Sequence, residues 1–337
     1  MFIQGDCNNI LKDTETDSID LIVTDPPYGI EFMGKDWDKA VVPTETWKEC
    51  YRVLKQGKLA FVMCSPRQDV LSRMIVNLQD AGFRTNYTSI YHTYASGFPK
   101  AANLKNGSYV GFQPKPAVEV ILVVSKGKTL TWLDDCRIPY QSEDDLAESK
   151  PWSEKGHLGF GPLGGKQLSD GEGNNTNEKG RFPANLLCQD DILNDGRITK
   201  TVPGSFGNTD YRQYSINNGY RQQGNHKGKE KIKLFGDTGS YSRYFSLDQW
   251  WAKTFPFLIV PKPAKSEKGE FNVHPTVKSQ KLMSYLITMG SREGDLVLDP
   301  FCGSGTTLLA AKLLKRNFVG IELNRDYYQT ALDRLRD

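Results

Sequence analysis

Long apolar runs are missing from this sequence. The longest cover residues 59–64, 117–124 (with one Glu) and 257–261, far below the roughly 18–20 residues of a membrane span. The first residues, MFIQGDCNN, contain no basic segment followed by an apolar one, which is the pattern of a secretory signal. We therefore expect a cytoplasmic protein that does not cross a membrane.

Cysteine pairs and histidine clusters are missing as well. The six Cys (7, 50, 64, 136, 188 and 302) form no CxxC pair, and the four His (92, 157, 226 and 274) are dispersed. Zinc sites need such side chains at close spacing, so the sequence predicts no metal site. Scattered cysteines in a cytoplasmic protein are expected to be reduced thiols.

The chain also has no excess of one charge sign. Lys and Arg number 43 against 40 Asp and Glu, a net charge of +3 over 337 residues. This balance by itself argues neither for nor against a polyanionic partner. A hydrophobic fraction of 38% with 25% charged residues indicates a folded chain, and the length fits about two domains.

Short apolar runs alternate with amphipathic segments at both ends of the chain, as expected for a parallel sheet with helices on both faces. The predicted strands are 19–23, 59–63, 118–124, 296–298 and 318–321, and the predicted helices are 44–55, 67–81 and about 306–315. The middle differs, because 141–250 holds 16 of the 31 Gly and is rich in Asn, Ser and Gln. We predict one α/β domain formed by 1–130 and 250–337, interrupted by a loop-rich insert at 131–249.

Acidic residues follow four of the apolar runs. Asp6 follows FIQG, Asp25 follows IDLIVT, Asp299 follows LVL and Glu322 follows FVGI. Ligands of open parallel sheets bind outside the carboxyl ends of the strands. Four carboxylates there predict a ligand with amines, hydroxyls or a positive charge. The alternative for each one alone is that it caps the next helix.

The segment DPFCGSGTT at 299–307 combines a strand end, a glycine turn and a helix start. Gly303 and Gly305 allow the backbone to approach a ligand closely. Glu322 comes 23 residues after Asp299, near the spacing at which a carboxylate binds ribose hydroxyls. A dinucleotide fingerprint would need a third Gly where Leu308 stands, and a phosphate loop would need a Lys. A ligand with a ribose but no phosphate fits better, and S-adenosylmethionine is one.

The segment TDPPYGI at 24–30 places two prolines directly after a strand. The prolines fix the backbone, so the Asp25 carboxylate and the Pro26 carbonyl are held rigidly beside the flat ring of Tyr28. Two acceptors beside an aromatic face suit a planar substrate with an exocyclic amine. The alternative is a rigid turn with a packed tyrosine.

DPPY together with DPFCGSGTT resembles the S-adenosylmethionine-dependent DNA amino-methyltransferases. The catalytic motif precedes the cofactor motif, with an insert between them, as in the circularly permuted β group of that family. The segments GDCNNIL (5–11), YHTYASGFPK (91–100), KPAVE (115–119) and VHPTVKSQKLM (273–283) resemble further family motifs. The resemblance implies a Rossmann-like methyltransferase fold, with a mostly parallel sheet, helices on both faces and an inserted target-recognition region.

The resemblance also implies roles for individual residues. The catalytic residues would be Asp25, Pro26, Pro27 and Tyr28. The cofactor would be bound by Asp6, Asp25, Thr276, Lys278, Asp299, Phe301, Gly303, Ser304, Gly305, Thr306 and Glu322. Among these, Thr276 and Lys278 would hold the methionine carboxylate; the alternative for Lys278 is a solvated helix face. The target base would be flipped out of the duplex onto Tyr28, with Tyr91 or Phe98 as a second wall, unless Tyr91 is a core aromatic.

The insert carries its own charge excess. Residues 196–247 hold nine basic and three acidic residues, a local net charge of +6, with tyrosines interleaved. Basic, aromatic and amide side chains together suit phosphate contacts and base readout. The DNA contacts are predicted at Arg212, Arg221, Lys229, Lys231 and Lys233. The alternative is a solvated basic surface.

These patterns predict a site-specific DNA methyltransferase that modifies N6 of adenine. A cytosine-N4 enzyme with the same mechanism is the close alternative, and the Asp of the DPPY tetrad favours adenine within the family. Ring-carbon methylation would use a Pro-Cys pair, which this sequence lacks. A DNA-binding module with a relic cofactor fold and an RNA or small-molecule methyltransferase are more remote alternatives. The expected partner is double-stranded DNA, and the resemblance admits a homodimer and a cognate restriction endonuclease, in a bacterial or phage-infected cytoplasm.

Overall fold

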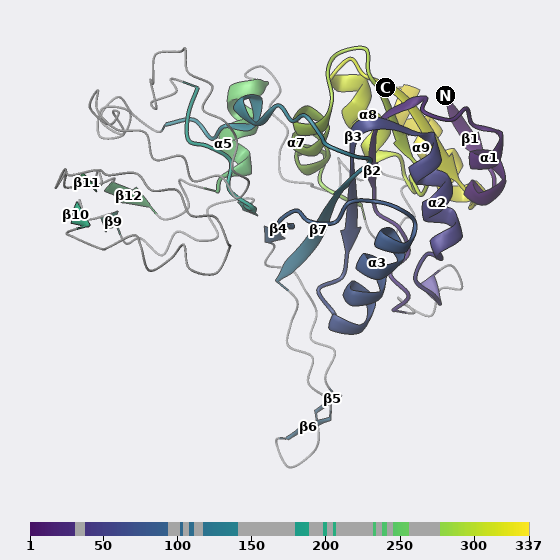
Figure 1. Ribbon diagram of the computed structural model, residues 1–337, viewed down its shortest axis with the longest axis horizontal. Coiled ribbons are helices and arrows are strands. Elements are labelled where there is room, and N and C mark those ends of the chain that lie inside the picture. The colour runs from purple at the N-terminus through teal and green to yellow at the C-terminus, as the bar shows by residue number, and fades with distance from the viewer. Residues whose placement is uncertain are drawn as a thin grey trace, which may run out of the picture.

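The computed structural model describes residues 1–30, 38–93, 117–140, 179–188, 245–255 and 277–336, together with short backbone segments between them. Its centre is an eight-stranded sheet (Figure 1). In spatial order the strands are β1 (Phe2–Gln4), β14 (Asn317–Glu322), β13 (Leu296–Asp299), β2 (Ile19–Thr24), β3 (Leu54–Cys64), β7 (Val118–Ser125), β4 (Ile90–Thr93) and β8 (Leu186–Cys188). All neighbours pair in parallel except β7, which is antiparallel to both β3 and β4. The predicted mostly parallel α/β sheet is confirmed.

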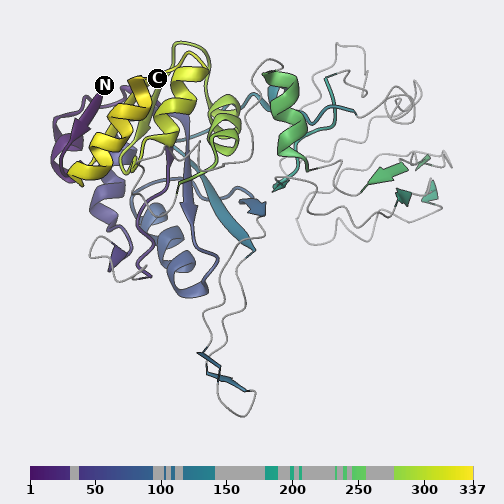
Figure 2. The ribbon, with the colours of Figure 1, turned by 180° about the vertical axis from the view of Figure 1, so that it is seen from behind.

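Helices cover both faces of this sheet (Figures 1 and 2). One face packs against α1 (Cys7–Asp13), α2 (Thr44–Val53) and α3 (Gln68–Asp80). The other packs against α5 (Leu247–Thr254), α7 (Gln280–Gly290) and α8 (Thr306–Leu313). The last helix, α9 (Arg325–Arg336), packs against α8, β1 and β14.

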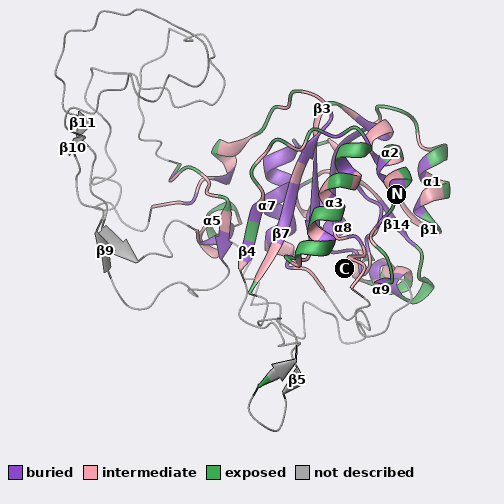
Figure 3. Cartoon of the chain, turned by 60° about the horizontal axis from the view of Figure 1, so that its bottom comes forward, coloured by how far each residue is buried: buried purple, intermediate pink, exposed green. Residues whose placement is uncertain are grey.

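Strand β2 shows why its apolar run is continuous rather than alternating. Leu21 and Val23 face the core beneath α7, while Ile19 and Ile22 face the core beneath α2. A strand covered on both faces needs apolar side chains on both. On α2, Trp47 is fully buried, in line with the amphipathic pattern of that segment. Figure 3 shows the buried strands, the exposed outer face of α3 and the buried α7.

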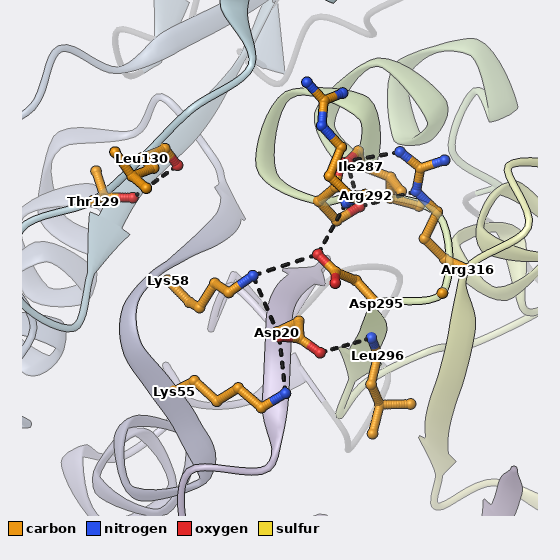
Figure 4. Close-up of polar contacts among 12 residues, drawn as sticks. Asp20, Lys55, Lys58, Thr129, Leu130, Ile287, Arg292, Asp295, Leu296 and Arg316 are labelled. Carbon is orange, nitrogen blue, oxygen red and sulfur yellow. Dashed lines mark hydrogen bonds and ion pairs between the residues drawn. The ribbon is translucent and has the colours of Figure 1, made fainter.

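Strand β3 begins five residues earlier than the predicted 59, at Leu54. After the buried Leu54 the additional residues carry no apolar side chain, and ion pairs hold them at the amino end of the sheet. Lys55 and Lys58 both contact Asp20 of β2, at 2.9 and 3.3 Å, and Lys58 also contacts Asp295 at 3.4 Å (Figure 4). A search for apolar residues misses this part of the strand.

Both ends of the predicted insert pack with the sheet domain. The 3₁₀ helix η3 (Leu133–Cys136) contacts α7, and β8 is the outermost strand of the main sheet. Cys136, Ile138 and Leu187 all lie in the core beneath α7. Cys136 and Ile138 stand singly among polar residues, and Leu187 lies in the three-residue run LLC, so no long apolar run indicated their burial. The sheet domain therefore includes residues inside the range 131–249.

Three small antiparallel strand pairs complete the described structure. They are β5 (Ala102–Asn103) with β6 (Tyr109–Val110), β9 (Ile198–Lys200) with β12 (Thr238–Ser240), and β10 (Ser205–Phe206) with β11 (Ile232–Lys233). Among the described residues, no helix has both the length and the apolar character needed to cross a membrane.

Candidate active site

Four acidic residues meet at one edge of the sheet. Strands β1, β14, β13 and β2 are adjacent and parallel, so their carboxyl ends lie side by side. Asp299 and Glu322 are the last residues of β13 and β14, and Asp25 and Asp6 follow β2 and β1. The sheet therefore brings together the four residues that the sequence predicted at strand ends.

Asp25 is the centre of a hydrogen-bonded group drawn from three parts of the chain. The Tyr28 hydroxyl donates to Asp25 Oδ1 at 2.5 Å and lies 3.0 Å from Glu119 Oε1 of β7. The Lys278 ammonium, just before α7, lies 3.2 Å from Asp25 Oδ2 and is paired with Glu119. It also lies 5.6 Å from the centre of the Tyr28 ring. We call these four residues the Asp25 cluster.

The charges of the Asp25 cluster shift one another's pKa values. Burial raises the pKa of Asp25, and the nearby charge of Glu119 adds to this while Lys278 opposes it. Burial also tends to raise the pKa of Glu119, but the charge of Lys278 and its hydrogen bond oppose burial, and the net effect is a lowered Glu119 pKa. Burial opposes the charge on Lys278, yet the two carboxylates raise its pKa well above the usual value. One lysine thus forms ion pairs with two partly buried carboxylates.

A further carboxylate holds the loop that carries Tyr28. Asp38 Oδ1 accepts hydrogen bonds from the backbone N–H groups of Tyr28 at 2.7 Å and Gly29 at 2.9 Å. Asp38 is 2% exposed. Gly29 has φ +72°, and a Cβ there would come within 2.6 Å of the Val41 nitrogen. Sequence reasoning missed Asp38, because its link to DPPY depends on the path of the loop.

At the carboxyl end of β13, Asp299 is hydrogen-bonded to the end of the neighbouring strand β2. It accepts a 2.6 Å hydrogen bond from the Thr24 hydroxyl of β2 and a 3.1 Å bond from the Phe301 backbone N–H. Burial raises the pKa of Asp299 to about 7, although these bonds and one from Thr307 work against the rise. Asp299 is 2% exposed, so its carboxyl group lies inside the protein.

Glu322, the last residue of β14, is hydrogen-bonded to the glycine turn that lies between β13 and α8. Its Oε2 accepts from the Gly303 N–H at 2.8 Å and its Oε1 from the Asn324 N–H at 2.7 Å. Burial raises the Glu322 pKa. Gly303 (φ +52°) and Gly305 (φ +80°) adopt the left-handed conformation that favours glycine. A carboxylate has about four acceptor sites, so the Glu322 carboxylate still has capacity to accept from a hydroxyl donor.

The turn itself is tied to α9. Arg334 donates to the Ser304 carbonyl at 2.5 Å, to the Ser304 hydroxyl at 3.0 Å and to the Thr306 hydroxyl at 3.3 Å. Phe301 packs edge-on against Trp47, with ring centres 6.2 Å apart. Arg334 was missed, because nothing in its local sequence marks it as a partner of the turn.

Two residues predicted to bind the cofactor have other partners in the structure. Asp6 caps α1, with its Oδ1 accepting from the Asn8 N–H at 2.8 Å. Lys278, expected at the cofactor carboxylate or on a solvated helix face, is instead paired within the Asp25 cluster. The alternative interpretation of Lys278, a side chain on a solvated helix face, is wrong, because this side chain is only 18% exposed.

Tyr91 is not brought to the Asp25 cluster. The register pairs His92 with Glu119 and Tyr91 with Val120. Directly opposed residues share a face and neighbours alternate, so Glu119 shares its face with His92, and Tyr91 is on the other face and 39% exposed. The core-aromatic alternative for Tyr91 is therefore wrong too. His92 was missed, although it stands beside Tyr91 in the same motif.

The remaining predicted contacts lie outside the described residues. They are Phe98, Arg212, Arg221, Lys229, Lys231 and Thr276. Lys233 belongs to β11, of which only the backbone is described.

The sheet order, the glycine turn after β13 and the acidic carboxyl edge define a Rossmann-like α/β protein of the S-adenosylmethionine-dependent methyltransferase fold. The PvuII DNA methyltransferase, described as cytosine-N4-specific, shares this fold with a TM-score of 0.51 at 15% identity, covering 100% of this chain and 86% of that one. The sequence profile of the N6/N4 DNA methylase family matches residues 19–333, and the chain belongs to that family.

Curated relatives match a shorter region. The type II methyltransferase M.HindIII of Haemophilus influenzae is 52% identical over 62 residues, which are 18% of this chain and 20% of that protein. The type II methyltransferase M2.DpnII of Streptococcus pneumoniae is 47% identical over 62 residues, or 18% of this chain and 23% of that protein. The chain thus aligns with about a fifth of the length of these relatives.

Proposed function

We propose that this chain is a DNA methyltransferase that moves a methyl group from S-adenosylmethionine to the exocyclic N6 of adenine. The observation that carries the proposal is the Asp25 carboxylate beside the Tyr28 ring, at the carboxyl end of β2 in a member of the DNA methylase family. A carboxylate acceptor beside an aromatic face is what a planar base with an amino group requires.

The acidic edge fits S-adenosylmethionine as the methyl donor. The Glu322 carboxylate has capacity left to accept from a ribose hydroxyl, and the left-handed Gly303 and Gly305 carry no side chains where the turn would approach the ligand. The Asp25 cluster, with two carboxylates and one ammonium, supplies a net negative charge near a cationic sulfonium. When bound, the cofactor supplies a methyl group that is already activated by the positive charge on sulfur.

The protein's contribution is then to position the amine. The target base leaves the duplex and stacks on Tyr28, because a paired base cannot reach this edge. Its amino N–H groups donate to Asp25 and to the Pro26 carbonyl, which favours a pyramidal nitrogen with an exposed lone pair. This lone pair would take the methyl group of the bound cofactor, and the proton that the nitrogen then loses would pass by way of the Asp25 carboxylate to solvent. Positioning and electrostatics account for the rate, without a covalent enzyme intermediate.

The cytosine-N4 reaction is the second candidate, since the amino group of cytosine offers the same two N–H donors. The PvuII enzyme of the same fold is described as cytosine-N4-specific. Incubating the chain with methyl-labelled S-adenosylmethionine and mixed-sequence DNA, followed by nucleoside chromatography, separates the candidates. N6-methyladenine supports the proposal, N4-methylcytosine supports the alternative, and the absence of any methylated nucleoside refutes both.

The Asp25→Ala variant tests the catalytic assignment. We expect methyl transfer to be lost while S-adenosylmethionine binding, measured by calorimetry, is largely retained, because Asp25 mainly contacts the amine in this proposal. Asp20→Ala is a control, since Asp20 lies at the opposite end of β2. Near-normal turnover by Asp25→Ala would show that another group accepts the amine hydrogen bond.

We also propose that the basic part of the insert contacts the DNA phosphates. The support is the local charge of +6 over residues 196–247. Neutralising Lys229, Lys231 and Lys233 together should weaken binding at all DNA sequences. The slope of log K against log salt should become shallower by the amount expected for the loss of about three phosphate contacts. An unchanged slope in fluorescence-anisotropy titrations would remove this segment from the interface. A homodimer and a cognate endonuclease stay predictions of the resemblance.

A further inference from the structure

Both oxygens of the Asp25 carboxylate are already hydrogen-bonded within the protein. Oδ1 accepts from the Tyr28 hydroxyl at 2.5 Å, and Oδ2 lies 3.2 Å from the Lys278 ammonium. Glu119 contacts the same two donors, since its Oε1 lies 3.0 Å from the Tyr28 hydroxyl and is paired with Lys278. Asp25 and Glu119 therefore compete for one ammonium and one hydroxyl.

We propose that Lys278 and Glu119 are positioning residues that act through Asp25. Lys278 keeps Asp25 an ionised acceptor, and Glu119 retains Lys278 when Asp25 Oδ2 turns to the amino group of the substrate. This inference rests on the proposed methyl transfer at Asp25.

The charge arrangement explains why both partners are needed. Two partly buried carboxylates without Lys278 would share a site as like charges, and one of them would take up a proton. A protonated Asp25 is a poorer acceptor for an amine. Without the charge of Glu119, Lys278 would pair with Asp25 alone and occupy the oxygen that the substrate needs. A buried charge that loses its only partner is costly, so the second carboxylate makes the release of Asp25 easier.

Three neighbouring strands of the described sheet contribute further titratable groups. Cys64 of β3 and Asp299 of β13 interact with Asp25, and His92 of β4 interacts with Glu119. Burial raises the pKa of the Cys64 thiol to about 12, so it stays neutral. Asp299, whose pKa is about 7, ionises in the assay range, and it does so in every variant below.

The test compares Lys278→Met with Glu119→Gln in the pH dependence of kcat/KM for methyl transfer. Losing Lys278 removes the charge that lowers the Asp25 pKa, so the acid limb moves to higher pH and kcat/KM on that limb falls roughly tenfold or more. Losing the Glu119 charge removes a repulsion, so the acid limb moves to lower pH while kcat falls. Lys278→Arg should restore the wild-type limb. Lys281→Met is the matched control on the same segment, since Lys281 pairs with Asp248 instead.

A second measurement needs no turnover. In the cofactor-free chain with ¹³C-labelled aspartate carboxyls, the Asp25 resonance, assigned with Asp25→Asn, is titrated in each variant. We expect its pKa to rise in Lys278→Met and to fall in Glu119→Gln, with S-adenosylmethionine affinity unchanged in both. Shifts in the same direction, no shift, or a Lys278→Met variant that loses cofactor affinity would overturn the inference. A wild-type chain without methyl transfer would instead refute the proposed function, and the titration would still decide the relation among the three residues.

Discussion

The buried carboxyl group of Asp299 makes the stability of this protein depend on pH. Its pKa of about 7 in the folded state compares with 3.8 for an ordinary aspartate. Between these two values the folded state binds a proton that the unfolded state has released, so the free energy of unfolding falls as pH rises. The contribution is fully present below the unfolded pKa and is lost by the folded pKa.

The magnitude follows from that difference. Each pH unit between the two pKa values costs about 1.4 kcal/mol. Between pH 5 and pH 8 the wild type should therefore lose about 3 kcal/mol of unfolding free energy relative to Asp299→Asn, whose amide does not ionise. The amide oxygen can still accept the bonds from Thr24 and Phe301, so the variant isolates the charge.

The assay is urea unfolding of both proteins at pH 5 and pH 8, without cofactor. The control is Asp20→Asn at the amino end of the sheet, where bonds from Leu296, Lys55 and Lys58 outweigh burial and lower the Asp20 pKa (Figure 4). Its contribution has the opposite sign: it is present above the unfolded pKa and lost as pH falls through the folded pKa. If the stability difference between wild type and Asp299→Asn is the same at pH 5 and pH 8, the reasoning about Asp299 is wrong.

Two further variants probe the turn and the catalytic loop. Gly305→Ala should lower the free energy of unfolding, measured in urea, by about 1–3 kcal/mol, because φ is +80° and the new Cβ would lie 2.9 Å from the Ala331 Cβ. Gly294→Ala is the control and should lower it less, because Gly294 has φ +87° but nothing lies within 4 Å of the new Cβ. Equal losses in the two variants would exclude the clash with α9. Asp38→Ala should lower kcat about 100-fold with little change in cofactor affinity, because the backbone N–H groups of Tyr28 and Gly29 lose their acceptor. A stopped-flow methylation rate equal to that of the wild type would show that Asp38 is not needed to hold this loop.

The strands and their acidic ends were predictable because their signals are local. An apolar run ending in Asp25, Asp299 or Glu322 marks a strand and its carboxyl end, whichever strands lie beside it. The glycines at 303 and 305 mark the turn before α8 in the same way. Once the sheet is parallel in this region, the four ends meet at one edge.

The partners of these residues were less accessible. Glu119 was visible as a single charge within the apolar run VEVILVV, a signal that could have been followed, because a carboxylate in a covered strand needs a counter-charge. Its identity as a partner of Lys278 could not be read, since the two lie 159 positions apart. Arg334 and Asp38 carry no local signal at all.

The sequence by itself therefore determined the class of fold, the place of the DPPY tetrad after a strand and the acidic strand ends, because each depends on residues close together in the chain. Only the tertiary structure decided that Lys278 lies between Asp25 and Glu119, that His92 rather than Tyr91 shares the face of Glu119, and that β8 belongs to the sheet. These relations depend on strand order, direction and register. A shift of one residue in the pairing of β4 with β7 would reverse the faces, and the local sequence does not determine that pairing.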